Sequence, residues 1–310
     1  MERKMTIGFG YQESFPRELM IFHFIELQKF IRDCFDNNHP FWIARMSGIE
    51  STQIGRYLNG CLYEDLDIKG MRSHSGILVT GESDWKEFVE MTMKAMTDCD
   101  RLAIWDGGCY VQCKEIYEYM SHDSVYNKVC TIPAHSLEPY LFMDVEEYGF
   151  SDIFKGKKIL IITSHGHSVK SQVENNLDNI FHPLDIFKEK ENIIVYKCTQ
   201  QNGSNSDGYS WKGHYLKMCD DISRFDFDVA FIGCGGFSNL LGYYIRHGLN
   251  KSAIYVGGPI QIYFGIIGRR WLGNDRILKH IGKNGAHWIL PMKEDYTPGC
   301  MSVEEGCYWM

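Results

Sequence analysis

The stretch DFDVAFIGCGGFSNLLGYYIRHGLNKSAIYVGGPIQIYFGIIGRRW, residues 226–271, indicates the fold of this chain. Within it, the apolar run Val229–Gly233 passes through a glycine turn into an apolar segment of helical length. A second apolar run, Ala253–Val256, ends at another pair of glycines. Apolar runs without polar alternation are typical of parallel strands that are buried on both faces. The succession of strand, glycine turn and helix therefore predicts an α/β fold.

Similar apolar runs on the N-terminal side extend this pattern. We expect further strands at Phe41–Ala44, Leu102–Trp105, Val129–Ile132, Lys158–Thr163 and Ile193–Tyr196. Segments of helical length separate most of them, so the sequence predicts a Rossmann-like, mostly parallel sheet with helices on both faces. No linker is evident, and we expect a single domain over 1–310, with an N-terminal arm or helix at 1–40 and a polar surface loop at 199–210.

Local signals place several helices. Helices are expected to begin near Ser47, near Ser168, and near Asp84, where Glu87 follows at the spacing of a capping box. The segment Tyr209–Arg224 is expected to be an amphipathic helix. Its predicted apolar stripe consists of Trp211, Tyr215, Leu216 and Cys219.

Composition excludes several classes of function. The chain has 310 residues and a formal net charge of −8, which disfavours broad binding to nucleic acid or to anionic lipid. No apolar run approaches the roughly 18 residues of a transmembrane helix. The opening segment MERKMTIGFGYQES has no apolar stretch or cleavage site of a secretory signal, so we expect a cytoplasmic protein.

The first candidate site is ARMSGIES, residues 44–51, where a predicted strand turns into a helix. The free backbone N–H groups of such a helix end attract anions, and Arg45 and Glu50 lie beside the turn. The local sequence by itself favours a purely structural explanation, because Ser47 and Glu50 have the three-residue spacing of a capping box.

The glycine turns form the second and third candidates. Gly233, Gly235 and Gly236 follow one predicted strand, and Gly257 and Gly258 follow another. Glycines at such positions allow the backbone to approach a bound phosphate. The spacing is not GxGxxG, because position 238 is serine, so it indicates a nucleotide or sugar phosphate more than a dinucleotide. A tight strand-to-helix turn without a ligand explains it equally well.

Polar residues in an apolar segment follow the second glycine pair. The polar residues are Gln261, Arg269 and Arg270, and Trp271 beside them can stack on a ligand. Two adjacent guanidinium groups can clamp a diphosphate. An arginine pair more often forms a solvated surface, but the apolar neighbours here favour partial burial. The loop SHGHS, residues 164–168, is a fourth polar loop after a predicted strand. Together the four loops favour a ligand that contains phosphate.

These motifs resemble those of a family encoded in polysaccharide-biosynthesis gene clusters and related to glycosyltransferases of the GT-D type. The resemblance covers about residues 40–310. It rests on ARMSGIES, HSGILV, KGKKILIITSHGHSVKSQ, DGYSWKGHYLKM, the stretch 226–271, and the tail motifs AHWILP and GCYW. It implies a Rossmann-like enzyme that moves a sugar from a nucleoside-diphosphate sugar to a glycan or glycosylated acceptor.

The resemblance also implies roles for particular residues. GT-D enzymes carry an Asp-x-Glu pair for a divalent metal, Mn²⁺ or Mg²⁺, within an Arg-x-Gly-Asp-Gly-Glu context. Here Arg45 and Glu50 match, while Gly48 stands at the aspartate position, which leaves Glu50 as a metal ligand or as a catalytic base.

The chemistry of glycosyl transfer implies roles for the remaining residues. Arg269, Arg270 and the glycine turns are expected to hold the diphosphate. Asp106 is the reserve catalytic carboxylate, and His165 is expected to contact the sugar or the acceptor. The partners implied are a nucleotide-sugar donor and a glycan acceptor, while the sequence is silent on oligomeric state.

Two rival functions remain open from the sequence. The turn GCGGFS suggests a methyltransferase that uses S-adenosylmethionine, although such enzymes place the glycine turn after the first strand and this one comes late in the chain. The missing aspartate at position 48 suggests a non-catalytic protein that binds a nucleotide or glycan without turnover.

Overall fold

The computed structural model describes residues 16–63, 70–104, 129–138, 141–142, 152–180, 189–199, 209–284 and 287–309. Its centre is a parallel sheet of seven strands in the order β3-β2-β1-β7-β6-β4-β5. The strands are β1 (Trp42–Arg45), β2 (Arg101–Ile104), β3 (Thr131–Pro133), β4 (Ile159–Thr163), β5 (Ile193–Lys197), β6 (Val229–Gly233) and β7 (Ser252–Tyr255). Each overlaps the run predicted for it, and the predicted α/β, Rossmann-like fold is confirmed.

The strands are largely apolar because both faces of the sheet are covered. In β4, Ile159 and Ile161 join one hydrophobic cluster, while Leu160 and Ile162 join a second cluster on the opposite face. Alternate residues of a strand point to opposite sides, so a strand between two helical layers needs an apolar side chain at every position.

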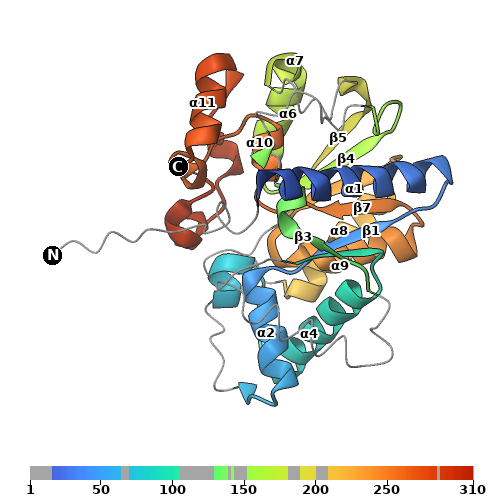
Figure 1. Cartoon of the computed structure of the whole chain (residues 1–310). Helices are drawn as coiled ribbons and strands as arrows, with labels where there is room; N and C mark the ends of the chain where they lie inside the picture. The colour runs from blue at the N-terminus through green and yellow to red at the C-terminus, as the bar shows by residue number, and fades with distance from the viewer. Residues whose placement is uncertain are drawn as a thin grey trace.

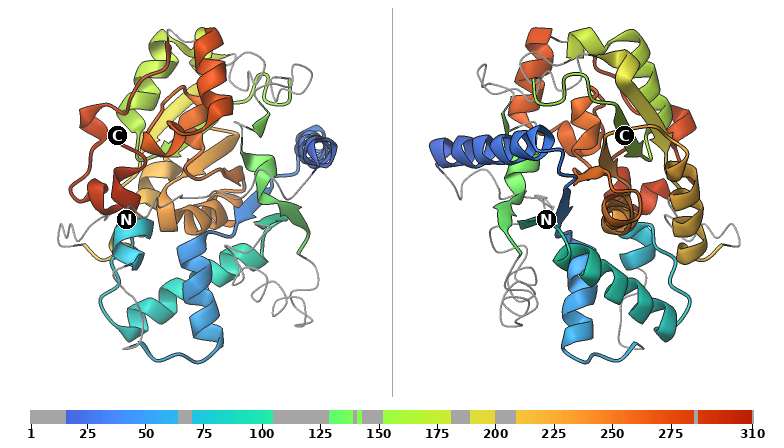
Figure 2. Two further views of the ribbon diagram at one scale, coloured as in Figure 1. Left: turned by 60° about the vertical axis from the view of Figure 1, so that its left-hand side comes forward. Right: turned by 90° about the vertical axis from the view of Figure 1, so that its right-hand side faces the viewer.

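Helices form a layer on each face. Against the first cluster pack α1 (Arg17–Asp36), α6 (Gly166–Asn175), α7 (Leu177–Ile180), α10 (Ile260–Tyr263) and α11 (Asp275–Asn284). Against the second pack α2 (Gly48–Leu58), α4 (Glu82–Thr97), α8 (Trp211–Ser223) and α9 (Ser238–Tyr243). Figure 1 shows α1 crossing in front of the sheet, and the right-hand view of Figure 2 shows α1 and the helices α8 and α9 on opposite sides of it.

Short helical turns make up much of the rest. Two π-helical turns are η2 (Met71–Ser75) and η9 (Tyr244–Gly248). The 3₁₀ turns are η4 (Ala134–Leu137), η6 (Lys190–Asn192), η8 (Gly235–Phe237), η10 (Arg269–Trp271), η12 (Lys293–Asp295), η13 (Cys300–Ser302) and η14 (Glu304–Gly306). None of the helices in the described ranges is long and apolar enough to cross a bilayer.

Two local predictions need correction. The helix expected near Asp84 is present as α4, which begins at Glu82 with Gly81 at the N-cap position. The carboxylate of Asp84 accepts from the backbone N of Thr80 at 2.8 Å, so the expected capping box with Glu87 is wrong. In α8 the predicted stripe is buried except for Leu216, which is 56% exposed. Leu216 lies five residues after Trp211, about 140° around the helix, and therefore faces away.

The N-terminal segment belongs to the core. Helix α1 buries Met20, Phe24, Leu27 and Ile31, and Phe24 stacks on Phe142 with ring centroids 4.1 Å apart. The predicted arm at 1–40 thus contains a helix that covers one face of the sheet. Of the predicted polar loop at 199–210, residues 200–208 lie outside the described part of the chain.

The strand order creates a crevice at the carboxyl ends of the strands. The strands β1 and β6 lead into α2 and α9 on one face, whereas β4 and β7 lead into α6 and α10 on the other. Connections that depart to opposite faces leave an opening between them, and ligands of open α/β sheets bind at such points outside the carboxyl ends of the strands.

Candidate functional site

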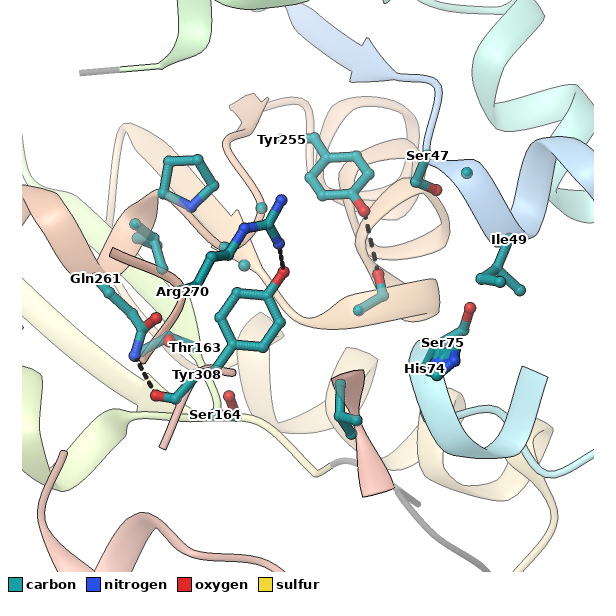
Figure 3. A pocket seen from close by; sticks show the side chains of 18 of the residues that line it. Ser47, Ile49, His74, Ser75, Thr163, Ser164, Tyr255, Gln261, Arg270 and Tyr308 are labelled. Carbon is teal, nitrogen blue, oxygen red and sulfur yellow. Dashed lines mark hydrogen bonds between the residues drawn. The ribbon is translucent and has the colours of Figure 1, made fainter. Parts of the chain in front are cut away.

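A cavity of about 450 Å³ occupies this crevice, above the carboxyl ends of the neighbouring strands β1, β7, β6 and β4. Its volume lies within the range of small-molecule sites, about 300–1,000 Å³. Figure 3 shows Ser47, Ile49 and Ser75 on one side of the cavity and Thr163, Ser164 and Gln261 on the other. The predicted site residues that line it are Arg45, Ser47, Glu50, His165, Gly233, Gly235, Gly257, Gly258, Gln261 and Arg270.

Glu50 stands in the first turn of α2 and is 5% exposed. It accepts a hydrogen bond from the hydroxyl of Ser47, which occupies the N-cap position without capping a backbone N–H through its side chain. The capping box expected here is therefore replaced by a direct contact between the two side chains. Burial, followed by the Glu50 carboxylate, raises the pKa of Tyr255, so this phenol stays protonated beside the cavity.

Arg45 is committed to an internal ion pair. Its guanidinium pairs with the carboxylate of Glu138 and donates to the carbonyl of Val256. Both side chains are more than nine-tenths buried, so Arg45 lines the cavity with its positive charge already neutralised. The predicted contribution of Arg45 to anion binding is correspondingly reduced.

Arg270 carries a positive charge at the cavity wall. Its guanidinium donates to the hydroxyl of Tyr308, and its backbone N donates to Cys307 at 2.7 Å. The guanidinium also lies 5.2 Å from the centre of the Tyr308 ring (Figure 3). These contacts hold the guanidinium in place at the cavity wall.

The neighbours of Arg270 do not join it in the cavity, which corrects the predicted arginine clamp. Arg269 is exposed and pairs with Glu305 at 3.4 Å. Trp271 is buried in the core and donates through Nε1 to Gln261 Oε1 at 3.3 Å. Successive side chains of the short turn η10 point in different directions, so two adjacent arginines cannot face one ligand.

Gln261 lines the cavity and also has a structural role. Its Nε2 donates to the backbone oxygen of Tyr308 at 2.9 Å, and the residue is 1% exposed. With its oxygen accepting from Trp271, both ends of the amide are used within the protein. Gln261 therefore holds the C-terminal segment in place.

The glycines at the strand ends are required by packing. A Cβ at Gly258 would lie 2.5 Å from the ring of Tyr308, and one at Gly233 would lie 2.7 Å from the carbonyl of Gly257. Gly235 and Gly257 have positive φ values of 53° and 76°. Gly236 does not line the cavity, and a Cβ on Gly236 would lie 2.9 Å from Glu50 Oε1. The structural explanation of these turns thus holds, and the turns still border the cavity.

His165 lies on the side of the cavity opposite Glu50, at the N-cap position of α6. Its Nδ1 lies 3.1 Å from the hydroxyl of Ser164, and its ring lies 5.3 Å from that of Trp309. Burial lowers the pKa of His165 to about 4, so the imidazole is neutral near pH 7.

The N-terminus of α6 already holds an anion. The carboxylate of Asp295, fully buried, accepts from the backbone N of His167 at 2.9 Å and from the backbone N of Ser168 at 2.7 Å. The backbone N–H groups of the SHGHS loop at this helix end are therefore already used by a carboxylate of the protein. The sequence hides this contact, because Asp295 lies 127 residues beyond Ser168.

Several lining residues were missed by sequence reasoning. They are Ser75, Thr163, Tyr255, Tyr308 and Trp309, together with Glu138, the ion-pair partner of Arg45. A partial signal existed for two of them, since the tail motif GCYW ends in Tyr308 and Trp309. The predicted carboxylate Asp106 lies outside the described residues.

The described residues fit a tightly held metal poorly. No group of three or more histidines, cysteines or carboxylates comes together within the ranges described. Glu50 is the acidic side chain among the described lining, and one of its oxygens already accepts from Ser47. A hard divalent cation bound by protein needs several oxygen ligands, and the described lining does not supply them.

Comparisons with known proteins give no further assignment. The chain matches no protein-family model, no curated protein and no solved structure.

Proposed function

We propose that this protein is a glycosyltransferase whose cavity binds a nucleoside-diphosphate sugar and transfers the sugar to a hydroxyl of a glycan acceptor. The observation that carries the proposal is the cavity across four strand ends, with Glu50 at one side and the cation Arg270 in its wall. The resemblance of the sequence motifs to GT-D enzymes points to the same chemistry.

The diphosphate is best accommodated near the end of β7. Arg270 lies there beside Tyr308, whose ring packs on Gly258, and the first turn of α2 brings Gly48 and Ile49 to the same cavity. A guanidinium and the N–H groups of a helix end both stabilise the charge that develops on a leaving diphosphate. Binding there would let Arg270 exchange the neutral Tyr308 hydroxyl for a charged partner, which makes the stronger hydrogen bond.

Glu50 is the proposed base. In the transfer, a new bond forms between the acceptor oxygen and the anomeric carbon, and the bond from that carbon to the diphosphate breaks. The acceptor proton passes to the Glu50 carboxylate, and the nucleoside diphosphate leaves with the bonding electron pair. A carboxylate held by one hydroxyl, as Glu50 is by Ser47, keeps a second oxygen for this proton.

A product assay tests the proposal. The full chain is incubated with a panel of nucleoside-diphosphate sugars and candidate glycan acceptors, and released nucleoside diphosphate and glycosylated product are measured. We expect one donor to be consumed, and Glu50→Gln to lower turnover by at least about a hundredfold while circular dichroism shows an intact fold. The matched control is Glu174→Gln, because Glu174 is exposed on α6 and remote from the cavity lining.

The outcomes separate the candidate functions. Turnover retained by Glu50→Gln would remove this residue from catalysis. Donor binding without any product would support the non-catalytic binding protein instead. Consumption of S-adenosylmethionine with methylation of an acceptor would overturn the transferase assignment.

A further inference from the structure

Two buried polar atoms in the cavity lining have no hydrogen-bond partner among the described residues. They are Oγ of Ser75, which is 3% exposed, and Nε2 of His165, which is 4% exposed. The backbone of Tyr308 is close to His165 but makes no hydrogen bond of normal geometry with Nε2. Buried polar groups in proteins are nearly always satisfied, so both atoms are expected to bond to a ligand.

The two atoms belong to different ends of the cavity. Ser75 ends η2, which packs against α2, and Figure 3 shows it beside His74 and Ile49, on the side away from Ser164. His165 follows β4. Strands β7 and β6 separate β1 from β4, so the loops after β1 and β4 are about 14 Å apart at roughly 4.8 Å per strand. A ligand that satisfies both atoms must therefore be extended.

The His165 end suits a neutral group. Burial keeps the imidazole uncharged near pH 7, and the carboxylate of Asp295 already occupies the adjacent helix end. An anionic group placed there would meet a like charge that Lys197, 3.5 Å from Asp295, offsets only in part. Uncharged hydrogen-bonding edges meet no such penalty.

The shape of this end suits a flat ring. The rings of His165 and Trp309 lie 5.3 Å apart, tilted by 33°, and the side chain of Val303 lines the same cavity. Trp309 is fixed by its own Nε1, which donates to the backbone oxygen of Asp295 at 3.2 Å. Rigid aromatic walls with one unused imidazole nitrogen are suited to a planar heterocycle with a polar edge.

The opposite end contains the reacting groups. Glu50 and its partner Ser47 stand after β1, on the same side as Ser75. A base must lie within hydrogen-bond reach of the hydroxyl that it deprotonates, so the transferred sugar and the acceptor hydroxyl belong at this end.

We propose that the donor lies across the sheet with its nucleobase at the end of β4, against His165 and Trp309, and its sugar at the end of β1, against Ser75 and Glu50. The diphosphate then lies near Arg270, at the end of the intervening strand β7. This orientation rests on the proposed function and goes beyond it, because it assigns each end of the cavity to one part of the donor.

Titration calorimetry on the full chain tests the orientation. The probes are UDP, GDP, CDP, ADP, inorganic pyrophosphate, and the glucose conjugate of each nucleotide that binds. His165→Leu should weaken binding of the preferred nucleoside diphosphate by at least about tenfold, yet leave pyrophosphate within about twofold. Ser75→Ala should reduce the affinity for the sugar conjugate relative to that for its nucleoside diphosphate.

Two further variants serve as controls for these measurements. His165→Gln, which retains a polar nitrogen at the end of the side chain, should recover part of the lost affinity. Ser136→Ala removes another buried hydroxyl that has no partner among the described residues, but one outside the cavity lining, and should bind every probe as the native chain does. Circular dichroism confirms that each variant folds.

Outcomes that contradict the proposed orientation can be distinguished from those that contradict the proposed function. If His165→Leu affects only the sugar conjugate while Ser75→Ala weakens the nucleoside diphosphate itself, the orientation is reversed. If His165→Leu weakens pyrophosphate as much as the nucleotide, that end holds phosphate. If the expected pattern is found but no glycosylated product forms in the product assay, the nucleotide subsite stands and the transfer fails. If no nucleotide binds, both proposals fail.

Discussion

At the scale of single residues, Arg45 and Glu138 form an ion pair beneath the cavity in which both side chains are more than nine-tenths buried. Breaking such a pair leaves an uncompensated charge in the interior. We therefore expect Arg45→Met to destabilise the fold by about 3–5 kcal/mol, measured as the free energy of unfolding in urea. The double variant Arg45→Met with Glu138→Leu should recover much of that loss, and an equal or larger loss would contradict the assignment.

Buried histidines make the stability of the fold depend on pH. The pKa values of His165 and His135 are both lowered to about 4, in each case chiefly by burial. An unfolded histidine titrates near 6.5, so between about pH 6.5 and 4 the unfolded chain takes up protons that the folded chain does not. The stability present above pH 6.5 should therefore fall as the pH decreases through this range.

Urea unfolding at a series of pH values checks this expectation. The variant His165→Gln should lose less stability than the native chain between about pH 7 and pH 5, because it lacks one of the buried histidines whose pKa is lowered. An identical pH dependence in the two proteins would show that His165 does not stay neutral when buried.

The sequence predicts site residues that lie next to strands. It does not predict site residues that are distant in sequence and come close only in the folded chain. Arg45 and Glu50 were identified because both flank a visible strand-to-helix turn. Glu138, the partner of Arg45, lies 93 residues away along the chain and carries no local signal. Arg269 and Arg270 are adjacent in sequence, and only the backbone of η10 decides that one faces solvent and the other the cavity.

At the scale of elements, the segment that ends in Tyr308 and Trp309 closes one wall of the cavity. It is held through Gly258, where a Cβ would lie 2.5 Å from the Tyr308 ring. We expect Gly258→Ala to displace this segment and to destabilise the fold by about 1–3 kcal/mol through overpacking. Thermal unfolding measures the effect, and Arg270, bonded to Tyr308, should lose its fixed position at the same time.

A glycine in α2 provides the matched control for this prediction. Gly55 lies inside a helix, and a Cβ there would meet nothing within 4 Å. Gly55→Ala should therefore stabilise the chain by about 0.5–1 kcal/mol. If Gly258→Ala behaves like Gly55→Ala, the close packing of Tyr308 on the turn is not needed for the fold.

At the scale of the whole molecule, the fold was predictable and the boundary of the site was not. Buried parallel strands are continuous apolar runs, which a sequence displays directly, and each of the seven predicted runs forms a strand. The order of those strands depends on which helices cover which face, and that order places the ends of β1 and β4 at opposite sides of one cavity. The C-terminal wall arises from long-range contacts such as that between Gln261 and Tyr308, which no local pattern encodes.

The most direct test of the central claim is the thermal unfolding midpoint of the full chain across a panel of nucleoside-diphosphate sugars, with and without Mn²⁺. A ligand that binds only the folded state stabilises it by about 2.7 kcal/mol at a hundred times its dissociation constant. The cavity across β1, β7, β6 and β4 predicts a clear rise in the midpoint with at least one such donor. No rise with any nucleoside-diphosphate sugar, together with a rise on adding S-adenosylmethionine, would contradict the claim.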